Sequence, residues 1–397
     1  MTTLPPELIL DILLRLPPKD LIRSLCISKA WYAFIHDQRF INAHLLRSTE
    51  TNSLTILITS CQRRPPPPPD LFSLPFSDNN TSGTAVKAEK PFKFPDAYDV
   101  LRLTGRSVHG LFCIQRKDER YMALWNPSIQ KLKKIPLPTF GNRKRYPLYG
   151  LGYDSVNDDY KLVGMVTDFV YNNNRNGFSR SVQVQIYSLK SNSWKRIQNA
   201  LLFSSISSGR TPIMFCNGAM SWLMVNEVDG NRYIIQTLNL ASEKYCQFPF
   251  PLVLISDDIV SLEVLGGCLC LCVYFPTGHA VWIMKEYGVT ESWTLLYSFE
   301  NKAVPSGVGF FSKPLVLSKN GEMVLTHNGR AFFWYDLRNK SFKQVQFSCP
   351  LLTQLHRTTF YVGSLCLLDG DPVIAERGAP ATADRCDLML SKLDLAT

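Results

Sequence analysis

The first apolar residues of the chain recur at helical spacing. Leu8, Ile9, Ile12, Leu13 and Leu16 fall on one stripe, which is the pattern of an amphipathic α-helix. Two prolines at 5 and 6 suit the first helical turn, where backbone amides have no partner inside the helix, and the prolines at 17 and 18 end it. The pattern predicts a helix within residues 4–16.

Three more short apolar groups follow before residue 46 and predict further helices. Ser28 precedes the second group and is a candidate N-cap. The groups are Leu21, Ile22 and Leu25; Trp31, Phe34 and Ile35; and Phe40, Ile41, His44 and Leu45. A module of about 45 residues cannot bury all these side chains within itself, because small domains hide a low fraction of their surface. Part of the apolar stripe is therefore expected to face a partner.

Residues 3–47 resemble the F-box without a gap. The resemblance lies in the Leu-Pro pairs at 4–5 and 16–17, in the Ser28-Lys29-x-Trp31 element and in the spacing between them. It implies docking to the Skp-type adaptor of a cullin-RING ubiquitin ligase. The residues that it places in or beside the adaptor groove are Leu4, Pro5, Leu8, Ile12, Leu16, Pro17, Leu21 and Cys26. Two alternatives stay open: the module is a structural bundle packed on a second domain, and Trp31 belongs either to its core or to the adaptor face.

From about residue 98 the pattern changes to short aromatic and β-branched runs separated by Gly, Asn, Asp and Pro turns, which is typical of strands. One phrase recurs: an apolar strand, a polar turn, then a large residue that is often followed by basic ones. The large residues are Leu132, Trp194, Tyr245, Trp293 and Phe342, about 50 residues apart after the first interval. This period is that of kelch-like propeller blades, and a closed ring of blades buries the faces that one blade cannot. About six blades are expected. A pair of β-sandwiches would not explain the repeat, and a partly open ring stays an alternative.

Further phrases between these repeats resemble the F-box-associated interaction domain of a large plant family that includes the S-locus F-box proteins. They include Gly110-Leu-Phe-Cys-Ile114, residues 149–163, Asn217-Gly-Ala-Met-Ser-Trp-Leu223 and Gly266-Gly-Cys-Leu-Cys-Leu271. The order matches over residues 105–365. The prediction is an α+β multidomain chain: an F-box at 1–47, a strand and Pro-rich variable linker or insertion at 48–97, an all-β, kelch-like propeller at 98–378 and a tail at 379–397.

The net charge of the chain does not by itself identify its binding partner. Lys and Arg number 43 against 33 Asp and Glu, a net +10, with the densest basic cluster at Lys131, Lys133 and Lys134 together with residues 143–145. A basic surface would suit an acidic substrate protein and predicts capture that salt weakens. Nucleic-acid binding is not expected, because no aromatic-basic stripe or known module accompanies the cluster.

The sequence contains few residues that could form a catalytic, cofactor-binding or metal-binding site. The dinucleotide, phosphate-loop, zinc-protease and Gly-x-Ser-x-Gly signatures are absent, and the six His are scattered. Cys268, Cys270 and Cys272 are the one tempting metal cluster, but alternate residues of a strand lie too far apart for one zinc ion unless the strand bends. No cofactor or metal is expected. A copper oxidase built on a kelch propeller would need converging Tyr and His ligands that the sequence does not single out.

The predicted cellular location also depends on features that the sequence lacks. No apolar run is long enough for a membrane span, and the N-terminus lacks the pattern of a signal peptide. Eleven Cys without framework spacing favour reduced, mostly buried thiols. Cytoplasm, nucleus or both are expected, with no membrane partner.

These patterns lead to one functional hypothesis and one alternative. In the first, the chain is the non-catalytic substrate-recognition subunit of an SCF ubiquitin ligase, and it links a target protein to the adaptor, and through it to cullin and RING subunits, for ubiquitination and degradation by the proteasome. The substrate site is unknown but expected on loops at one propeller face, with 172–177, 204–210 and Gly278-His279 as candidates. In the alternative, the propeller is a nucleic-acid or carbohydrate-binding module that acts outside the ligase.

Overall fold

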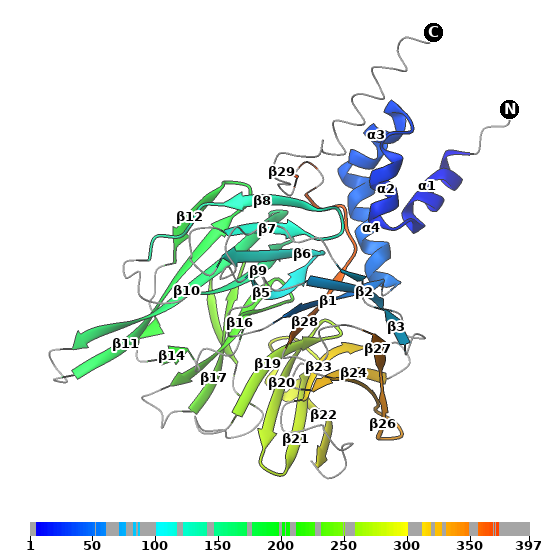
Figure 1. The fold of residues 1–397 in the computed structure, drawn as a ribbon. Helices are drawn as coiled ribbons and strands as arrows, with labels where there is room; N and C mark the ends of the chain where they lie inside the picture. The colour runs from blue at the N-terminus through cyan, green and yellow to red at the C-terminus, as the bar shows by residue number, and fades with distance from the viewer. Residues whose placement is uncertain are drawn as a thin grey trace, which may run out of the picture.

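The computed structural model describes most of the helical module and of the strands. The described residues are 5–51, 53–60, 71–76, 82–84, 86–87, 101–116, 122–140, 147–172, 177–197, 201–202, 204–206, 212–226, 232–248, 250, 259–300, 312–318, 322–327, 331–348, 356–367, 369 and 371–372. Helices lie at the N-terminal end and strands make up the rest (Figure 1).

Residues 5–51 form the four expected helices. They are α1 (Pro6–Arg15), α2 (Pro18–Ser24), α3 (Lys29–His36) and α4 (Gln38–Glu50). Ser28 caps α3 as predicted, since its Oγ accepts a hydrogen bond from the amide of Trp31 at 3.1 Å. Asp37 caps α4 in the same way, through the amide of Arg39 at 2.7 Å. None of the described helices is long and apolar enough to cross a membrane.

The described strands form six blades of a propeller, which confirms the predicted fold class. Blade 1 contains β28 (His356–Val362), β1 (Leu54–Ser60), β2 (Leu71–Phe76) and β4 (Val86–Lys87). Blade 2 contains β5 (Leu101–Val108), β6 (Leu111–Arg116), β7 (Met122–Asn126), β8 (Lys131–Ile135) and β29 (Asp371–Pro372). Blade 3 contains β9 (Leu148–Asp154), β10 (Asp159–Asn172), β11 (Gly177–Ser188), β12 (Ser193–Arg196) and β13 (Leu201–Leu202).

The second half of the ring repeats this plan. Blade 4 contains β14 (Ser204–Ile206), β15 (Met214–Cys216), β16 (Ala219–Asn226), β17 (Arg232–Asn239) and β18 (Tyr245–Phe248). Blade 5 contains β19 (Ile259–Leu265), β20 (Cys268–Phe275), β21 (Gly278–Met284) and β22 (Trp293–Glu300), with a short 3-10 helix η2 (Thr290–Ser292) before β22. Blade 6 contains β23 (Ser312–Leu317), β24 (Glu322–His327), β25 (Ala331–Asp336) and β26 (Ser341–Gln344). A parallel pair of β27 (Gln346–Ser348) and β3 (Ser82–Thr84) stands beside the blades.

Blade 1 closes the ring, because it joins strands from the two ends of the domain. β28 pairs antiparallel with β1, with Leu54 opposite Val362 and Ser60 opposite His356. The inner strands β28, β5, β9, β15, β19 and β23 then contact one another in turn around the ring. The boundary predicted at residue 98 therefore needs correction for 54–60 and 71–76: these residues belong to the propeller and not to a linker. The five prolines at 65–69 lie outside the described residues.

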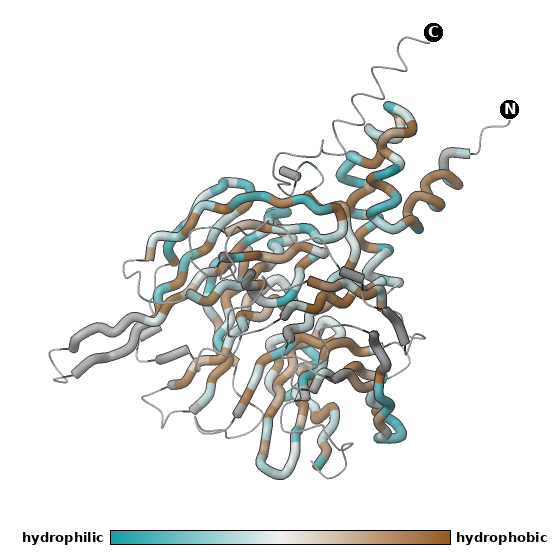
Figure 2. The backbone as a smooth tube through the Cα atoms, in the orientation of Figure 1, coloured by the Kyte–Doolittle hydropathy of each residue, from teal (hydrophilic) through white to brown (hydrophobic). Residues whose placement is uncertain are grey.

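The blades are held together by apolar side chains between their faces. Trp125 and Phe112 are buried between blades 1 and 2, and Trp222 is buried between blades 3 and 4. All three have no accessible surface, so the faces of these blades contact directly. Figure 2 shows the corresponding hydrophobic stretches along the central strands.

In blades 2, 3, 4 and 6 the repeated phrase corresponds to the turn before the fourth strand. Gln130, Asn192, Glu243 and Lys340 all take the left-handed conformation, with φ between 50° and 54°, two residues before the repeated large side chain. In three of these turns the side-chain oxygen of Asn126, Asn239 or Asp336 accepts a hydrogen bond from the backbone amide two residues further on. The repeat in the sequence is therefore the signature of one turn geometry. Two other turns also use left-handed backbone: Asp158 and the pair Asn217-Gly218 have positive φ, a conformation that Asn, Asp and Gly tolerate.

The helical module packs on the propeller through a short strap, Gly363–Leu367, that follows β28. Leu365 of the strap and Ile129 of blade 2 share one buried cluster with Leu21, Ile35 and other residues of the four helices. The buried Asn126 amide holds the strap, since its Nδ2 donates to the carbonyls of Ser364 at 3.0 Å and Cys366 at 2.8 Å. The strap thus fixes the helical module to blade 2.

Candidate adaptor-binding site

One face of α1 remains uncovered by the rest of the chain. Leu8 and Ile12 lie one helical turn apart and are 52% and 48% exposed. Leu10 is also exposed. Figure 2 shows hydrophobic residues along α1, which stands on the outer side of the helical module (Figure 1). This is the accessible apolar surface that the length of the module led us to expect.

The opposite face of α1 is fixed to α4. Leu13 is fully buried in the core of the module. Asp11 binds Arg15 at 2.7 Å on its own helix and Arg47 of α4 at 3.0 Å. The hydrogen bond from Arg15 lowers the pKa of the Asp11 carboxyl below its ordinary value. His44 of α4 shares a hydrogen bond of 2.9 Å with the carbonyl of Leu16, and burial lowers the pKa of its imidazole. These contacts hold α1 at a defined angle, so its free face is preorganised for a partner.

The structure places the predicted adaptor residues in different environments. Leu8, Ile12, Pro5 and Pro17 are exposed on or beside α1, and Leu16 is half-buried. Leu21 has no accessible surface, so in this conformation it supports the module from inside and offers a partner no contact. Leu4 lies outside the described residues. Cys26 is half-buried and disulfide-bonded, which departs from the expectation of uniformly reduced thiols.

Some exposed apolar residues were not singled out from the sequence. Ile27 is 61% exposed, Tyr32 50% and Leu46 60%. Phe34, expected on an apolar helix face, is also exposed. The exposure of Tyr32 and Phe34 could have been predicted from helix periodicity. Trp31 and Ile35 lie one turn apart on the inner face of α3, so the residues next to them must point elsewhere. Trp31 packs against the core of the module, which favours the core interpretation left open above.

The candidate substrate segments lie at the far ends of blades. The module sits at the end of the ring where β28 finishes, at Val362 and the strap. The tight pairs Asn172–Gly177 and Phe275–Gly278 lie where the second strand of a blade turns into the third, at the other end of the ring. In Figure 1 the β10–β11 hairpin projects away from the helices. His279 is buried, with 3% of its surface exposed, while residues 173–176 and 207–210 lie outside the described residues.

A buried carboxylate joins three inner strands. Glu263 of β19 is 1% exposed; its Oε2 accepts a hydrogen bond from Arg106 of β5 at 2.9 Å, and its Oε1 contacts the ammonium of Lys313 of β23. Arg106 also donates to the carbonyls of Pro314 and Leu315. Two cations around one carboxylate compensate its desolvation and link blades 2, 5 and 6. No local pattern predicts this contact, because the three residues lie far apart in the chain.

The three cysteines of β20 in blade 5 lie in or beside the buried core. Cys270 and Cys272 are free and fully buried on β20, and burial raises the pKa of both thiols. Cys268 is half-buried and free. Among the residues that the structure describes, no three His, Cys, Asp or Glu side chains come together in a way that could hold a metal ion.

Comparisons with known proteins agree with both parts of this architecture. The F-box domain model matches residues 1–42, and the F-box associated beta propeller domain model matches residues 80–367. The chain is 32% identical to F-box protein CPR1 of Arabidopsis thaliana, over 88% of this chain and 86% of that protein. It is 30% identical to F-box protein At4g22390 of the same plant, over 99% and 98%, and 26% identical to F-box/kelch-repeat protein At3g23880, over 85% and 89%. The chain therefore belongs to the F-box proteins that carry an F-box associated beta-propeller domain.

Proposed function

We propose that this protein is the substrate-recognition subunit of an SCF ubiquitin ligase. The single observation that carries the proposal is the uncovered apolar face of α1, with Leu8 and Ile12 exposed in a module whose buried core packs on the propeller through Ile129 and Leu365. A Skp-type adaptor would cover this face, and through it the cullin and RING subunits would be recruited. Isolated apolar side chains are common on surfaces, but here they form the preorganised face of an F-box.

In this role the chain performs no chemistry on ubiquitin. The propeller holds a target protein, and the complex raises the local concentration of the target beside an E2 enzyme charged with ubiquitin. Acyl transfer takes place on the other subunits, and proteasomal degradation would follow. We further propose that the protein acts in the cytoplasm, the nucleus or both.

The test is capture of a purified Skp-type adaptor by the full chain. Leu8→Asp/Ile12→Asp places two carboxylates in the proposed contact, and each buried leucine or isoleucine contributes about 1.5–3 kcal/mol to such an interface. We expect capture to fall by at least about a hundredfold.

A matched control is Val156→Asp/Leu295→Asp, since these two apolar residues are exposed on propeller blades 3 and 5. This variant should capture the adaptor as the unmodified chain does. Equal capture by all three proteins would contradict the proposal and would leave the propeller as a binding module outside the ligase.

A further inference from the structure

Cations lie on the facing sides of β8 in blade 2 and β12 in blade 3. Lys133 and Arg196 are exposed, and Lys131 is half-buried where β8 also pairs with the short strand β29. On β8, Lys131 and Lys133 share a face with Ile135, which packs in the core between these two blades. On β12, Arg196 shares a face with Trp194, which packs against the same core. Side-chain alternation therefore turns all three cations toward one line, which we call the 2/3 rim: Lys131, Lys133 and Arg196.

Two hydrogen bonds hold the blades together at this rim. Trp194 Nε1 donates to the carbonyl of Pro136 at 2.6 Å, directly after β8. Gln185 of β11 donates to the carbonyl of Thr139 at 2.9 Å. Leu137, between these contacts, is 40% exposed. The rim is thus a defined surface with an exposed apolar side chain beside its cations.

The next rim, between blades 3 and 4, has a different charge balance. Lys195 of β12 faces blade 4, and its Nζ lies 2.6 Å from a carboxylate oxygen of Glu243. Lys161 lies 2.9 Å from Asp154 in the same region. Lys195, the exposed cation of this second rim, is therefore neutralised within the chain, and Lys161 forms a buried pair beneath it.

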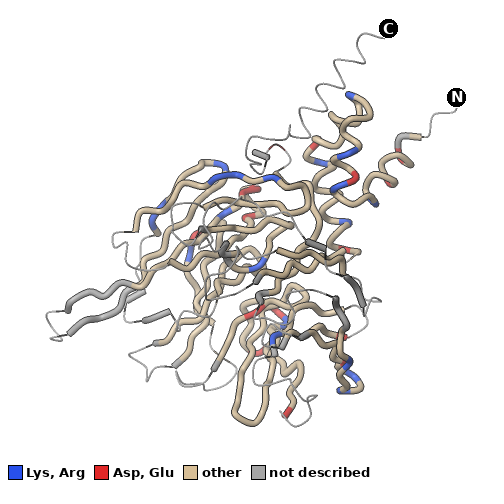
Figure 3. Tube along the Cα trace, viewed as in Figure 1, with Lys and Arg blue, Asp and Glu red and all other residues tan. Residues whose placement is uncertain are grey.

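At the 2/3 rim the charge is not neutralised. Lys131, Lys133 and Arg196 form no ion pair with any residue that the structure describes. Figure 3 shows blue segments along both β8 and β12. Lysines on an outer strand also prevent pairing with other chains, but a mixture of Lys and Glu serves that purpose equally well. Protection of the edge therefore does not account for a rim of a single charge sign.

We propose that the 2/3 rim is the docking surface for an acidic segment of the target protein, rich in Asp and Glu. This inference rests on the proposed function, because it names the class of substrate and where on the propeller it binds. Carboxylates of such a segment would pair with Lys131, Lys133 and Arg196, and Leu137 would contact an apolar residue beside them. In the view of Figure 1, the α2–α4 helices stand between β8 and α1, so this surface is separate from the adaptor face.

The test measures binding of a fluorescent oligo-glutamate peptide to the full chain by anisotropy. The unmodified protein should bind it, and affinity should fall as salt rises. Lys133→Glu/Arg196→Glu should weaken binding by about tenfold or more at low salt and should flatten the salt dependence, since two attractions become repulsions.

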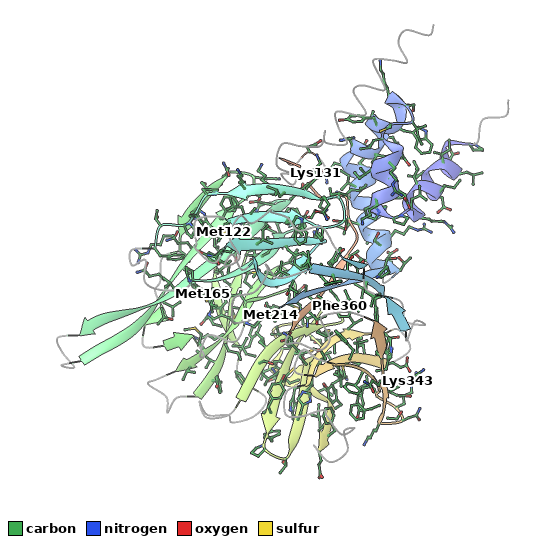
Figure 4. All side chains as sticks on the ribbon, in the orientation of Figure 1. Met122, Lys131, Met165, Met214, Lys343 and Phe360 are labelled. Carbon is green, nitrogen blue, oxygen red and sulfur yellow. The ribbon has the colours of Figure 1, made fainter. Side chains whose placement is uncertain are left out.

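The matched control replaces one arginine and one lysine on blade 6, in the turn before its fourth strand β26 and on that strand. Arg338→Glu/Lys343→Glu makes the same charge change at exposed positions of that blade, and Figure 4 shows Lys343 well apart from Lys131. It should retain binding within about twofold. Equal losses in both variants would mean attraction to the net charge of the whole molecule and would overturn the inference, as would absence of binding to the unmodified chain.

Two further measurements distinguish this inference from the proposed function and from a nucleic-acid site. Lys133→Glu/Arg196→Glu should still capture the Skp-type adaptor, and Leu8→Asp/Ile12→Asp should still bind the peptide. Loss of adaptor capture in the rim variant would assign the rim to the adaptor and overturn the inference while the proposed function stands. A single-stranded oligonucleotide that displaces the peptide and binds more tightly at the same residues would overturn it in favour of nucleic acid.

Discussion

The two faces of the F-box module have the same kind of sequence and opposite environments. Leu21 and Ile35 face blade 2 and the strap and have no accessible surface, whereas Leu8 and Ile12 are about half exposed. All four residues belong to apolar positions of amphipathic helices: Leu8 and Ile12 lie on α1, whereas Leu21 lies on α2 and Ile35 on α3. The difference shows that an amphipathic pattern states which residues avoid water but not which partner covers them. Here the propeller covers one face, and the other face is free for a second protein.

The largest expected effect is the difference in the free energy of unfolding between a substitution on the inner face and one on the outer face. Leu21→Ala removes a fully buried side chain and should lower the free energy of unfolding by about 2–5 kcal/mol. Leu8→Ala acts on an exposed position and should change it by less than about 0.5 kcal/mol. Guanidinium titration of the full chain measures both. Adaptor capture should respond in the opposite order among variants that remain folded, and equal stability losses would contradict the division into an inner and an outer face.

A second comparison concerns two asparagines at equivalent turn positions. Asn126 of blade 2 holds the strap through three hydrogen bonds, to Ser364 and Cys366, in addition to its own turn. Asn239 of blade 4 makes only local bonds, to Ala241 and Ser242. Asn126→Ala should cost about 2–3 kcal/mol, because it leaves buried carbonyls without a donor, and Asn239→Ala about 1 kcal/mol.

Hydrogen exchange gives this comparison a local measurement. In Asn126→Ala the amides of residues 364–367 should exchange faster while those of β16 and β17 remain protected. In Asn239→Ala the strap should remain as protected as in the unmodified chain. Slow exchange of the strap in both variants would show that the F-box is held on the propeller by its apolar contacts alone.

The extent to which the sequence predicted this molecule follows from the range of its contacts. The helices, the Ser28 cap and the turns before Leu132, Trp194, Tyr245 and Phe342 were predictable, because each depends on residues only a few positions apart. Closure of the ring was not, since β1 pairs with a strand about 300 residues later. A lone apolar run at 54–58 gives no indication of that partner, which is why it was assigned to a linker.

The candidate site shows the same limit. The spacing of Leu8 and Ile12 marked the helix face, but Leu21 belonged to an equally apolar pattern, and its burial depends on Ile129 and Leu365 from the other domain. The pair Arg106–Glu263 likewise joins residues far apart in the chain. Sequence periodicity thus identified the elements, while the surfaces between domains and blades required the tertiary structure.

The last comparison concerns the two buried histidines, one in each domain, and leaves stability near pH 7 almost unchanged at His279, so that the difference between the two sites appears as a pH dependence. His44 bonds the Leu16 carbonyl, whereas neither ring nitrogen of His279 has a hydrogen-bond partner among the described residues. Burial lowers the pKa of His279 to about 4 from an ordinary value of 6.5. A base with a lowered pKa in the folded state contributes stability that is fully present above pH 6.5 and is lost as pH falls toward the folded value, because the unfolded chain binds the proton first. Between neutral pH and pH 4 the propeller should lose up to about 3 kcal/mol from this group.

His279→Phe keeps an aromatic ring against Tyr274 and Tyr297 without a titrating nitrogen. Its stability near pH 7 should be unchanged or higher, and its loss on acidification should be shallower than that of the unmodified chain. His44→Phe removes a bonded imidazole and should cost stability already at neutral pH. Unfolding titrations at a series of pH values compare the two. A profile for His279→Phe that runs parallel to that of the unmodified protein would mean that the imidazole of His279 gains a proton in the folded state as readily as in the unfolded chain.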